Sequence, residues 1–187
     1  MKRKYLFASM VLVFLTNVFS QTEVKASTSF EQFLMKKGTL VTKEFIKFGE
    51  FTSKPYNITG EIAILTDVNT GAKVYALRVS TLYITKYDFD TIIGVFDVAE
   101  IDSAINSIKY MIETRNTGIY KDGYTEIEYK GSGDPSIGYY HNDEEEKAFF
   151  KINYKQTNFF EVSEIESLLT FFEQAKNKII ELGGKFK

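Results

Sequence analysis

Two segments of the chain match each other without a gap. Residues 96–113 (FDVAEIDSAINSIKYMIE) align with residues 160–177 (FEVSEIESLLTFFEQAKN). Identical residues stand at Phe96/Phe160, Val98/Val162, Glu100/Glu164, Ile101/Ile165 and Ser103/Ser167. Each segment passes from an apolar strand end into a helical pattern with a carboxylate in its first turn, a charge that a helix N-terminus favours. The match predicts an internal duplication. The alternative is that any two strand-to-helix junctions share these features.

Similar elements precede the two segments in the same order. In the first half, β-branched and aromatic runs predict strands at residues 40–51, 58–67, 73–85 and 92–96, followed by a helix at 98–113. In the second half, strands are expected at residues 124–130, 136–141, 147–155 and 159–161. The last helix is expected to begin at Ser163, with Glu166 completing a capping box, and to end at Gly183.

The upstream strands extend the match. Residues 74–80 lie over residues 149–155, an alignment that places Tyr75/Phe150, Leu77/Ile152 and Val79/Tyr154 on one face. The first half then has an insert around Thr81 to Thr91 that the second half lacks. The role of this insert does not follow from its sequence.

These elements predict an α+β fold in a single domain. Two similar β-β-β-β-α units, residues 38–115 and 116–187, are expected to form antiparallel sheets, each covered by a helix and related by a pseudo-twofold axis. Residues 21–37 form a lead-in, with a short helix predicted over 30–37. Phe171 and Phe172 adjoin on the last helix and cannot share one narrow stripe, so we expect Phe171 to pack between the halves or to mark a dimer contact.

The order of these units is similar to the organisation of Whirly and Pur-alpha type folds, which bind nucleic acid. The resemblance covers the order of the elements and no family motif. It implies two units related by a twofold axis, but a fold carries no function by itself.

The N-terminus has the three parts of a secretory signal. Lys2, Arg3 and Lys4 precede an apolar run over residues 6–19, which is too short to favour a stable membrane span. We expect cleavage after Ser20, with a second candidate site after Ala26. The signal peptide is then residues 1–20, and the processed chain has no transmembrane span. We expect an exported protein, periplasmic or extracellular, of a bacterial envelope; the alternative is a retained N-terminal anchor.

Composition excludes several functional classes. The chain has no Cys, so it has no disulfides, no thiol nucleophile and no zinc site of the CxxC type. Loss of the signal removes three basic residues and no acidic one, which leaves 20 Lys and Arg against 25 Asp and Glu. This net charge of −5 disfavours nucleic acid as a partner. The 17 Phe and 12 Tyr supply apolar side chains for a packed core.

One surface feature suggests binding. If the aligned strands turn Leu77 and Ile152 towards the helices, other side chains face outward and mix aromatic rings with amides and cations. The candidate binding face comprises Arg78, Phe149, Lys151, Asn153, Lys155 and Tyr139. Tyr139 and Tyr140 are neighbours, so only one of them can share this face. We expect a soluble, non-enzymatic protein that binds a protein, a glycan or another envelope component.

Two other functions remain open. A small envelope hydrolase could use carboxylates such as Asp88 and Asp90, together with His141, the single histidine. His141 and the acidic run at residues 143–146 more simply form a solvated turn, and no catalytic, metal or cofactor motif occurs. We therefore predict no cofactor, no metal and no catalytic residues. The third function is a structural homodimer.

Overall fold

The computed structural model describes residues 28–118 and 123–186. The first unit contains a short helix, four strands and a long helix. They are α1 (Ser29–Leu34), β1 (Val41–Phe51), β2 (Ile58–Asp67), β3 (Lys73–Ile84), β4 (Phe89–Asp97) and α2 (Val98–Thr117). The second unit repeats the four strands and the helix. They are β5 (Thr125–Lys130), β6 (Ser136–His141), β7 (Glu146–Asn153), β8 (Gln156–Phe160), the short 3-10 helix η1 (Val162–Glu164) and α3 (Ile165–Glu181). The predicted fold class, α+β with two antiparallel four-stranded sheets each followed by a helix, is confirmed.

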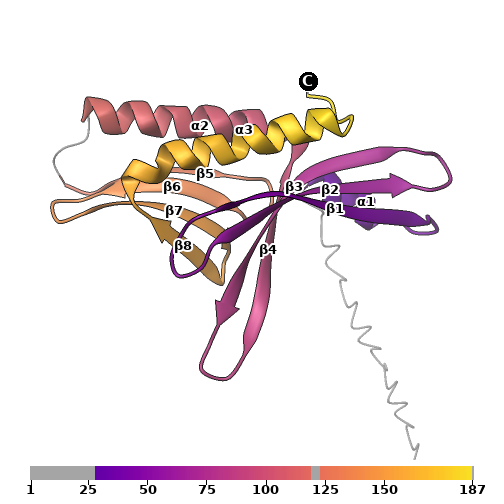
Figure 1. Cartoon of the computed structure of the whole chain (residues 1–187), viewed down its shortest axis with the longest axis horizontal. Coiled ribbons are helices and arrows are strands. Elements are labelled where there is room, and N and C mark those ends of the chain that lie inside the picture. The colour runs from indigo at the N-terminus through magenta and orange to yellow at the C-terminus, as the bar shows by residue number, and fades with distance from the viewer. Residues whose placement is uncertain (1–27, 119–122, 187) are drawn as a thin grey trace, which may run out of the picture.

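Both sheets are antiparallel meanders, with the orders β1-β2-β3-β4 and β5-β6-β7-β8. The two long helices lie side by side above them (Figure 1). Ion pairs join Asp102 to Lys176, Lys109 to Glu173 and Arg115 to Glu166, so α2 and α3 run in opposite directions. α3 packs on β1, β2 and β3 of the first unit, while α2 contacts both β3 and β4 of its own unit and β5 and β6 of the second. Each unit therefore supplies a helix to the sheet of the other.

The main core is shared between the units. The ring of Phe172 in α3 lies 5.3 Å from that of Phe96 in β4 and 6.0 Å from that of Phe150 in β7. Phe171 turns the other way and contacts Phe48, at 5.1 Å between ring centroids, in β1. All these residues except Phe48 are buried, and Phe48 packs against the same cluster. Phe171 thus packs between the halves, which was one of the two expectations for this residue.

The short helix α1 covers part of the side of the first sheet that faces away from the long helices. Phe30 and Phe33 pack there on Ala63, Leu65 and Ala76. The Asp97 carboxylate holds the helix by accepting hydrogen bonds from Ser29 N at 2.5 Å, Ser29 Oγ at 2.7 Å and Phe30 N at 3.1 Å. The lead-in helix was predicted over 30–37; it begins one residue earlier and ends at Leu34. Residues 21–27 of the lead-in lie outside the described residues.

The connection between β1 and β2 crosses to the other sheet. Lys54 and Phe159 exchange two backbone hydrogen bonds of 2.7 Å, which attach residue 54 to β8, the last strand of the second sheet. Beneath this bridge, the fully buried Asn158 amide donates to Ser53 Oγ at 3.1 Å, to Thr81 Oγ1 at 3.2 Å and to Tyr56 O. The two units are therefore joined by a polar network as well as by the apolar core.

Four details differ from the expectations. Tyr154 is 78% exposed in the β7–β8 turn and does not face the helices with Val79. Phe96 lies opposite Leu77 on the neighbouring strand, and its counterpart Phe160 lies opposite Ala148. The structural equivalent of Leu77 in the second unit is therefore Ala148, which is four residues before Ile152, the residue that the sequence alignment matched with Leu77. An even shift keeps the same face, which explains why the alternation alone could not fix the alignment.

The other two differences concern the insert and a cap. Residues 81–91 do not form a separate insertion, because β3 and β4 run through them and meet in a short turn after Ile84. The first turn after β8 is closed by Glu164, whose Oε2 accepts from Glu161 N at 3.0 Å. Glu100 closes the turn after β4 in the same way, at 2.9 Å from Asp97 N. The expected Ser163/Glu166 box is therefore displaced by two residues.

Candidate binding face

The outer face of the β5–β8 sheet is the side turned away from α2 and α3. Residues directly opposite each other on antiparallel strands project to the same side. Tyr140 pairs with Lys147, and Phe149 pairs with Gly138 and Phe159, so these side chains belong to the outer face. Tyr139 pairs with Ile127 and Ala148 and belongs to the inner face, which the helices cover.

An aromatic ring comes from each strand or its immediate flank. Tyr124, just before β5, stacks on Tyr140 of β6 with 6.1 Å between ring centroids. Phe149 of β7 and Phe159 of β8 stand opposite each other further along the sheet. We call these four residues the aromatic track. With strands about 4.8 Å apart, the track extends roughly 14 Å across the sheet.

Phe149 forms the floor of the track. A Cβ added at Gly138 would lie 2.2 Å from Phe149 Cζ, so the ring lies flat across the glycine of the neighbouring strand. Only a residue without a side chain at position 138 leaves room for this ring. Phe149 is consequently 8% exposed, while Phe159 and Tyr124 on either side of it are exposed to solvent.

The two tyrosines are held by carboxylates. Tyr140 Oη donates to Glu145 Oε1 at 2.8 Å, and Tyr124 Oη donates to Glu126 Oε2. Burial, together with the bond to Glu145, raises the pKa of Tyr140 to about 12. The hydrogen bond to Glu126 is the main cause of a raised pKa of Tyr124. Both phenols remain neutral at physiological pH, and the rings are fixed in orientation.

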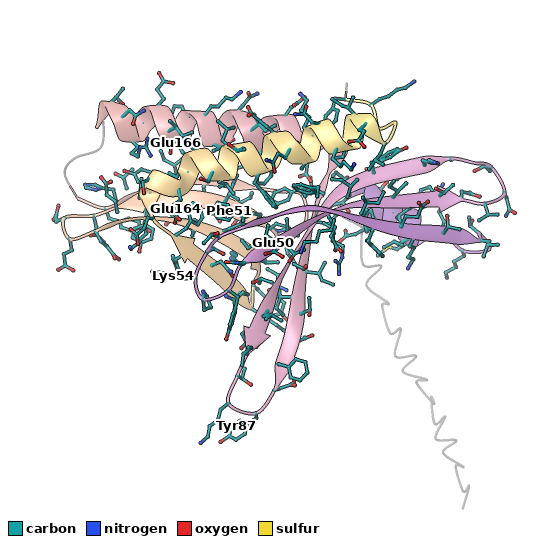
Figure 2. The ribbon with its side chains drawn as sticks, in the orientation of Figure 1. Glu50, Phe51, Lys54, Tyr87, Glu164 and Glu166 are labelled. Carbon is teal, nitrogen blue, oxygen red and sulfur yellow. The ribbon has the colours of Figure 1, made fainter. Side chains whose placement is uncertain are left out.

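Cations border the aromatic track. Lys151 projects from β7 beside Phe149, and Lys147 pairs with Glu161 at 2.8 Å. That bond raises the pKa of Lys147 and lowers the pKa of Glu161. A hollow of about 260 Å³ adjoins the track at the β8 edge, and Lys54, Lys147, Phe159 and Glu161 line it. Figure 2 shows Lys54 beside the β8 edge.

A carboxylate of β5 also borders the track. Glu128 of β5 accepts from Ser136 Oγ at 2.6 Å and pairs with Lys130 at 3.0 Å. Although burial raises the pKa of Glu128, the bonds from Ser136 and Lys130 hold it below its ordinary value. The outer face thus combines aromatic rings with charged groups of both signs.

The structure separates the residues predicted for the binding face. Phe149 and Lys151 lie together on the outer face of the second sheet. Asn153 ends β7, where its side chain accepts from Lys155 N at 2.8 Å, so both belong to the turn at the end of that sheet. Arg78 lies on the first sheet, paired with Glu61 and 5.1 Å from the Phe45 ring. Tyr139 is 4% exposed in the core, so the residue on the outer face is Tyr140.

The residues of the hydrolase alternative do not meet. Asp88 and Asp90 lie at the tip of the β3–β4 hairpin, where each accepts from the next backbone N–H. His141 ends β6 in the other sheet, with Nδ1 3.1 Å from Glu146 Oε1. Within residues 28–118 and 123–186, no group of three or more His, Asp or Glu side chains is arranged to hold a metal ion.

Sequence reasoning missed three residues of the aromatic track, Tyr124, Tyr140 and Phe159. Tyr140 was excluded by choosing the wrong one of two adjacent tyrosines. Phe159 could have been found from the register, because it follows the β7–β8 turn at the distance that places it opposite Phe149. Tyr124 could also have been found, because alternation over the expected strand at residues 124–130 puts it on the same face as Glu126 and Glu128, which the register places beside Tyr140 and Gly138.

Comparisons with known proteins give no match: no protein-family model, curated protein or solved structure matches the chain. Among the described helices, none is long and apolar enough to cross a membrane. The likeness to Whirly and Pur-alpha type folds therefore remains one of element order.

Proposed function

We propose that the protein is an exported, non-enzymatic binding protein that captures an extended glycan of the bacterial envelope on the outer face of the β5–β8 sheet. The observation that carries the proposal is the aromatic track, in which Tyr124, Tyr140, Phe149 and Phe159 cross four adjacent strands. α2 and α3 pack on the opposite side of this sheet, and on the outer face Tyr124 and Phe159 are exposed and Tyr140 is half-buried, with Phe149 buried beneath them.

The chemistry of the track favours a sugar chain. Sugar rings present apolar C–H faces and polar edges, and fixed aromatic rings bordered by polar groups can contact both. Lys147 and Lys151 flank Phe149 on the outer face of β7, where they can reach hydroxyl or carboxylate groups of such a chain. Glu128 and the tyrosine-bound carboxylates can accept hydrogen bonds from sugar hydroxyls.

The proposed export fits the fold. Cleavage after Ser20 or after Ala26 would occur before Thr28, which caps α1 and is buried. Either cut leaves the hydrogen bonds between α1 and Asp97 intact. We further propose that the two units arose by duplication, since Glu100 and Glu164 close equivalent turns at aligned positions.

Binding can be tested by affinity electrophoresis and calorimetry with cell-wall polysaccharide fractions of the source organism. Replacing Phe159 and Tyr124 by Ala removes two exposed rings of the track. We expect the affinity to fall at least about tenfold, while the melting temperature changes by a few degrees only. Tyr154→Ala is the matched control, because Tyr154 is an exposed tyrosine in the β7–β8 turn and outside the track.

Two results would overturn the proposal. One is unchanged polysaccharide binding by the double variant. The other is that the wild-type protein captures an envelope protein but no glycan, and that the double variant no longer captures this envelope protein. The second result would assign the same face to a protein partner. The hydrolase alternative would require release of small products from the bound fraction.

A further inference from the structure

The connection between β1 and β2 extends the outer face of the second sheet by one position. Lys54 and Phe159 exchange two backbone hydrogen bonds of 2.7 Å in an antiparallel bridge. Residues opposite each other in such a bridge project to the same side. The exposed Lys54 side chain therefore lies on the outer face next to the exposed Phe159 ring, at the β8 end of the aromatic track (Figure 2). A residue of the first unit thus completes the binding face of the second.

The backbone of Lys54 is held on both sides. The two bonds to Phe159 fix Lys54 itself. The preceding residue, Ser53, is buried, and its hydroxyl accepts from the Asn158 amide at 3.1 Å and donates to Tyr56 O at 2.7 Å. The cation therefore projects from a fixed point of the chain, although its side chain extends into solvent. A charge that is positioned in advance binds a ligand at a lower entropic cost than a charge on a mobile loop.

The hollow at the β8 edge adjoins this end of the track. It has a volume of about 260 Å³, and its lining includes the Phe159 ring and the charged residues Lys54, Lys147, Glu161 and Glu164. Pockets that enclose a drug-sized ligand have about 300–1,000 Å³. The hollow therefore fits a single sugar ring or its substituent, and the rest of a longer chain would continue along the track.

The charges around the hollow leave one positive charge for a ligand. Glu161 pairs with Lys147 at 2.8 Å, and this bond is the main cause of the lowered pKa of Glu161, with a smaller contribution from Lys54. Within the part of the chain that the structure describes, Lys54 has no ion pair of its own. Glu164 is engaged by the backbone, because it accepts from Glu161 N at 3.0 Å at the start of α3, where the helix dipole offsets part of its charge.

We propose that this hollow binds one singly charged anionic group of the captured glycan, a carboxylate or a phosphodiester, between the ammonium groups of Lys54 and Lys147, while the sugar ring that carries the group packs against Phe159. One negative charge matches the single positive charge that Lys54, Lys147 and Glu161 carry together. Both anionic groups accept hydrogen bonds from ammonium groups, which are donors only. This inference rests on the proposed glycan binding and names the class of glycan, an acidic polysaccharide.

The overall charge of the protein does not supply this preference. The whole chain carries a formal charge of −2, so a polyanion is not attracted by the net charge. Its binding therefore depends on the cations that line the hollow, and substitution of one of them should have a measurable effect.

Variants of Lys54 test the subsite with the untreated envelope polysaccharide fraction as the probe. Lys54→Gln should lower the affinity about five- to tenfold at low salt, and the difference should shrink as salt is added. Lys54→Arg keeps the charge and should retain most of the affinity. Lys155→Gln is the matched control, because it removes the same charge from an exposed lysine in the turn at the other end of β7. All three variants should melt within a few degrees of the wild type.

Neutralising the glycan identifies the anionic group. Carbodiimide with ammonia converts the carboxylates of the same fraction into neutral amides and leaves phosphodiesters intact. A loss of affinity of about tenfold on amidation assigns a carboxylate. Binding that survives amidation and still depends on Lys54 assigns a phosphodiester.

Two results would overturn the anionic subsite. One is binding of the amidated fraction that is as tight as that of the untreated fraction and is independent of Lys54. The other is equal affinity of Lys54→Gln, Lys155→Gln and the wild type for the untreated fraction. If the Phe159 and Tyr124 double variant still loses binding in either case, the proposed glycan function stands without the subsite. If the wild type binds no polysaccharide fraction at all, the proposed function fails together with this inference.

Discussion

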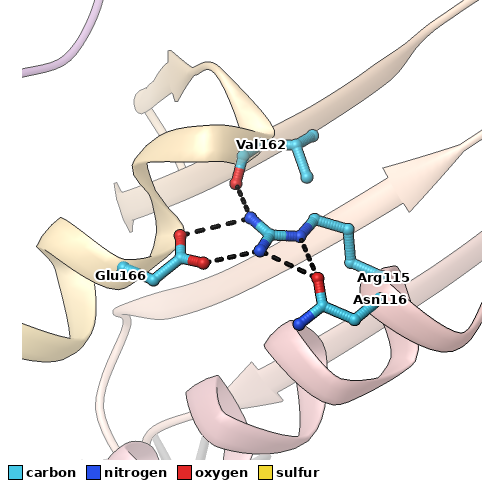
Figure 3. Close-up of polar contacts among 4 residues, drawn as sticks. All are labelled: Arg115, Asn116, Val162 and Glu166. Carbon is cyan, nitrogen blue, oxygen red and sulfur yellow. Dashed lines mark hydrogen bonds and ion pairs between the residues drawn. The ribbon is translucent and has the colours of Figure 1, made fainter.

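Arg115, in the last turn of α2, donates hydrogen bonds from both terminal nitrogens to the carboxylate of Glu166, in the first turn of α3, at 3.2 and 2.5 Å (Figure 3). The same guanidinium donates to Val162 O at 2.9 Å. A cation at a helix C-terminus and an anion at a helix N-terminus both suit the helix dipoles. The bond from Arg115 lowers the pKa of Glu166, and Glu166 in turn raises the pKa of Arg115.

Glu166→Gln should therefore destabilise the protein in a pH-dependent way. A carboxylate with a depressed pKa stabilises the fold above its unfolded pKa of about 4.3, and this stabilisation is lost as the pH falls through the folded value. We expect a loss of about 1 kcal/mol at pH 7 and a much smaller difference from wild type at pH 3. Urea unfolding at both pH values measures it. Glu173→Gln, which alters the more exposed pair with Lys109, is the control. Equal losses at both pH values would contradict this account.

Phe172→Ala should weaken both units at once. Its ring contacts Phe96 of the first unit and Phe150 of the second, and its side chain is fully buried. Removal of a buried Phe costs about 3–5 kcal/mol. Because the core is shared, unfolding followed by tyrosine fluorescence and by circular dichroism should remain a single transition in both proteins. Two separated transitions would show that the units are independent.

Asn158→Ala tests the polar connection between the units. The substitution removes the amide donor from Ser53 Oγ, Thr81 Oγ1 and Tyr56 O, and Tyr56 O keeps only the hydrogen bond from Ser53 Oγ at 2.7 Å. The Gln156 amide also loses its acceptor, Asn158 Oδ1. Unsatisfied buried groups cost about 1–3 kcal/mol, and we expect a loss within that range. Thr157→Ala, one residue earlier and partly exposed, is the matched control for chemical denaturation. If both variants unfold at the same denaturant concentration as wild type, the network does not contribute to stability.

The fold could be predicted because local patterns and burial agree. The apolar and aromatic runs at residues 58–67 and 136–141 predicted the bounds of β2 and β6 correctly, since turn residues flank each strand. The helical spacing of apolar residues after Val98 predicted the first residue of α2 correctly. By contrast, the crossing of each helix onto the other sheet depends on contacts such as Phe171 with Phe48, which no local pattern encodes.

The candidate site could be predicted only in part. Phe149 and Lys151 followed correctly from alternation in β7. Tyr139 was wrong because adjacent tyrosines satisfy either register, and burial of one face decides between them. Arg78 alternates in the same way but lies on a different sheet, paired with Glu61 of β2. Alternation assigns a residue to a face, and it does not say which faces adjoin.

Gly138→Ala should disturb the aromatic track from below. The added Cβ would lie 2.2 Å from Phe149 Cζ and 2.8 Å from Ile127 O, so the ring and the strand must both shift. Overpacking of this kind costs about 1–3 kcal/mol and should also weaken glycan binding. Gly49→Ala is the control, because its Cβ would meet only Gln174 at 3.6 Å. Thermal melting and calorimetry of the two variants measure both effects, and equal behaviour of the two would contradict the proposed floor.

Hydroxyl-radical footprinting of the tyrosines tests the proposed binding face most directly. Tyr124, Tyr87 and Tyr154 are all exposed, and they lie in the aromatic track, at the tip of the β3–β4 hairpin and in the β7–β8 turn, respectively. With saturating envelope polysaccharide, oxidation of Tyr124 should fall several-fold, while Tyr87 and Tyr154 should remain as reactive as in the free protein. Unchanged oxidation of Tyr124 in the bound state, or protection confined to Tyr87, would contradict the assignment of the glycan site to the outer face of the β5–β8 sheet.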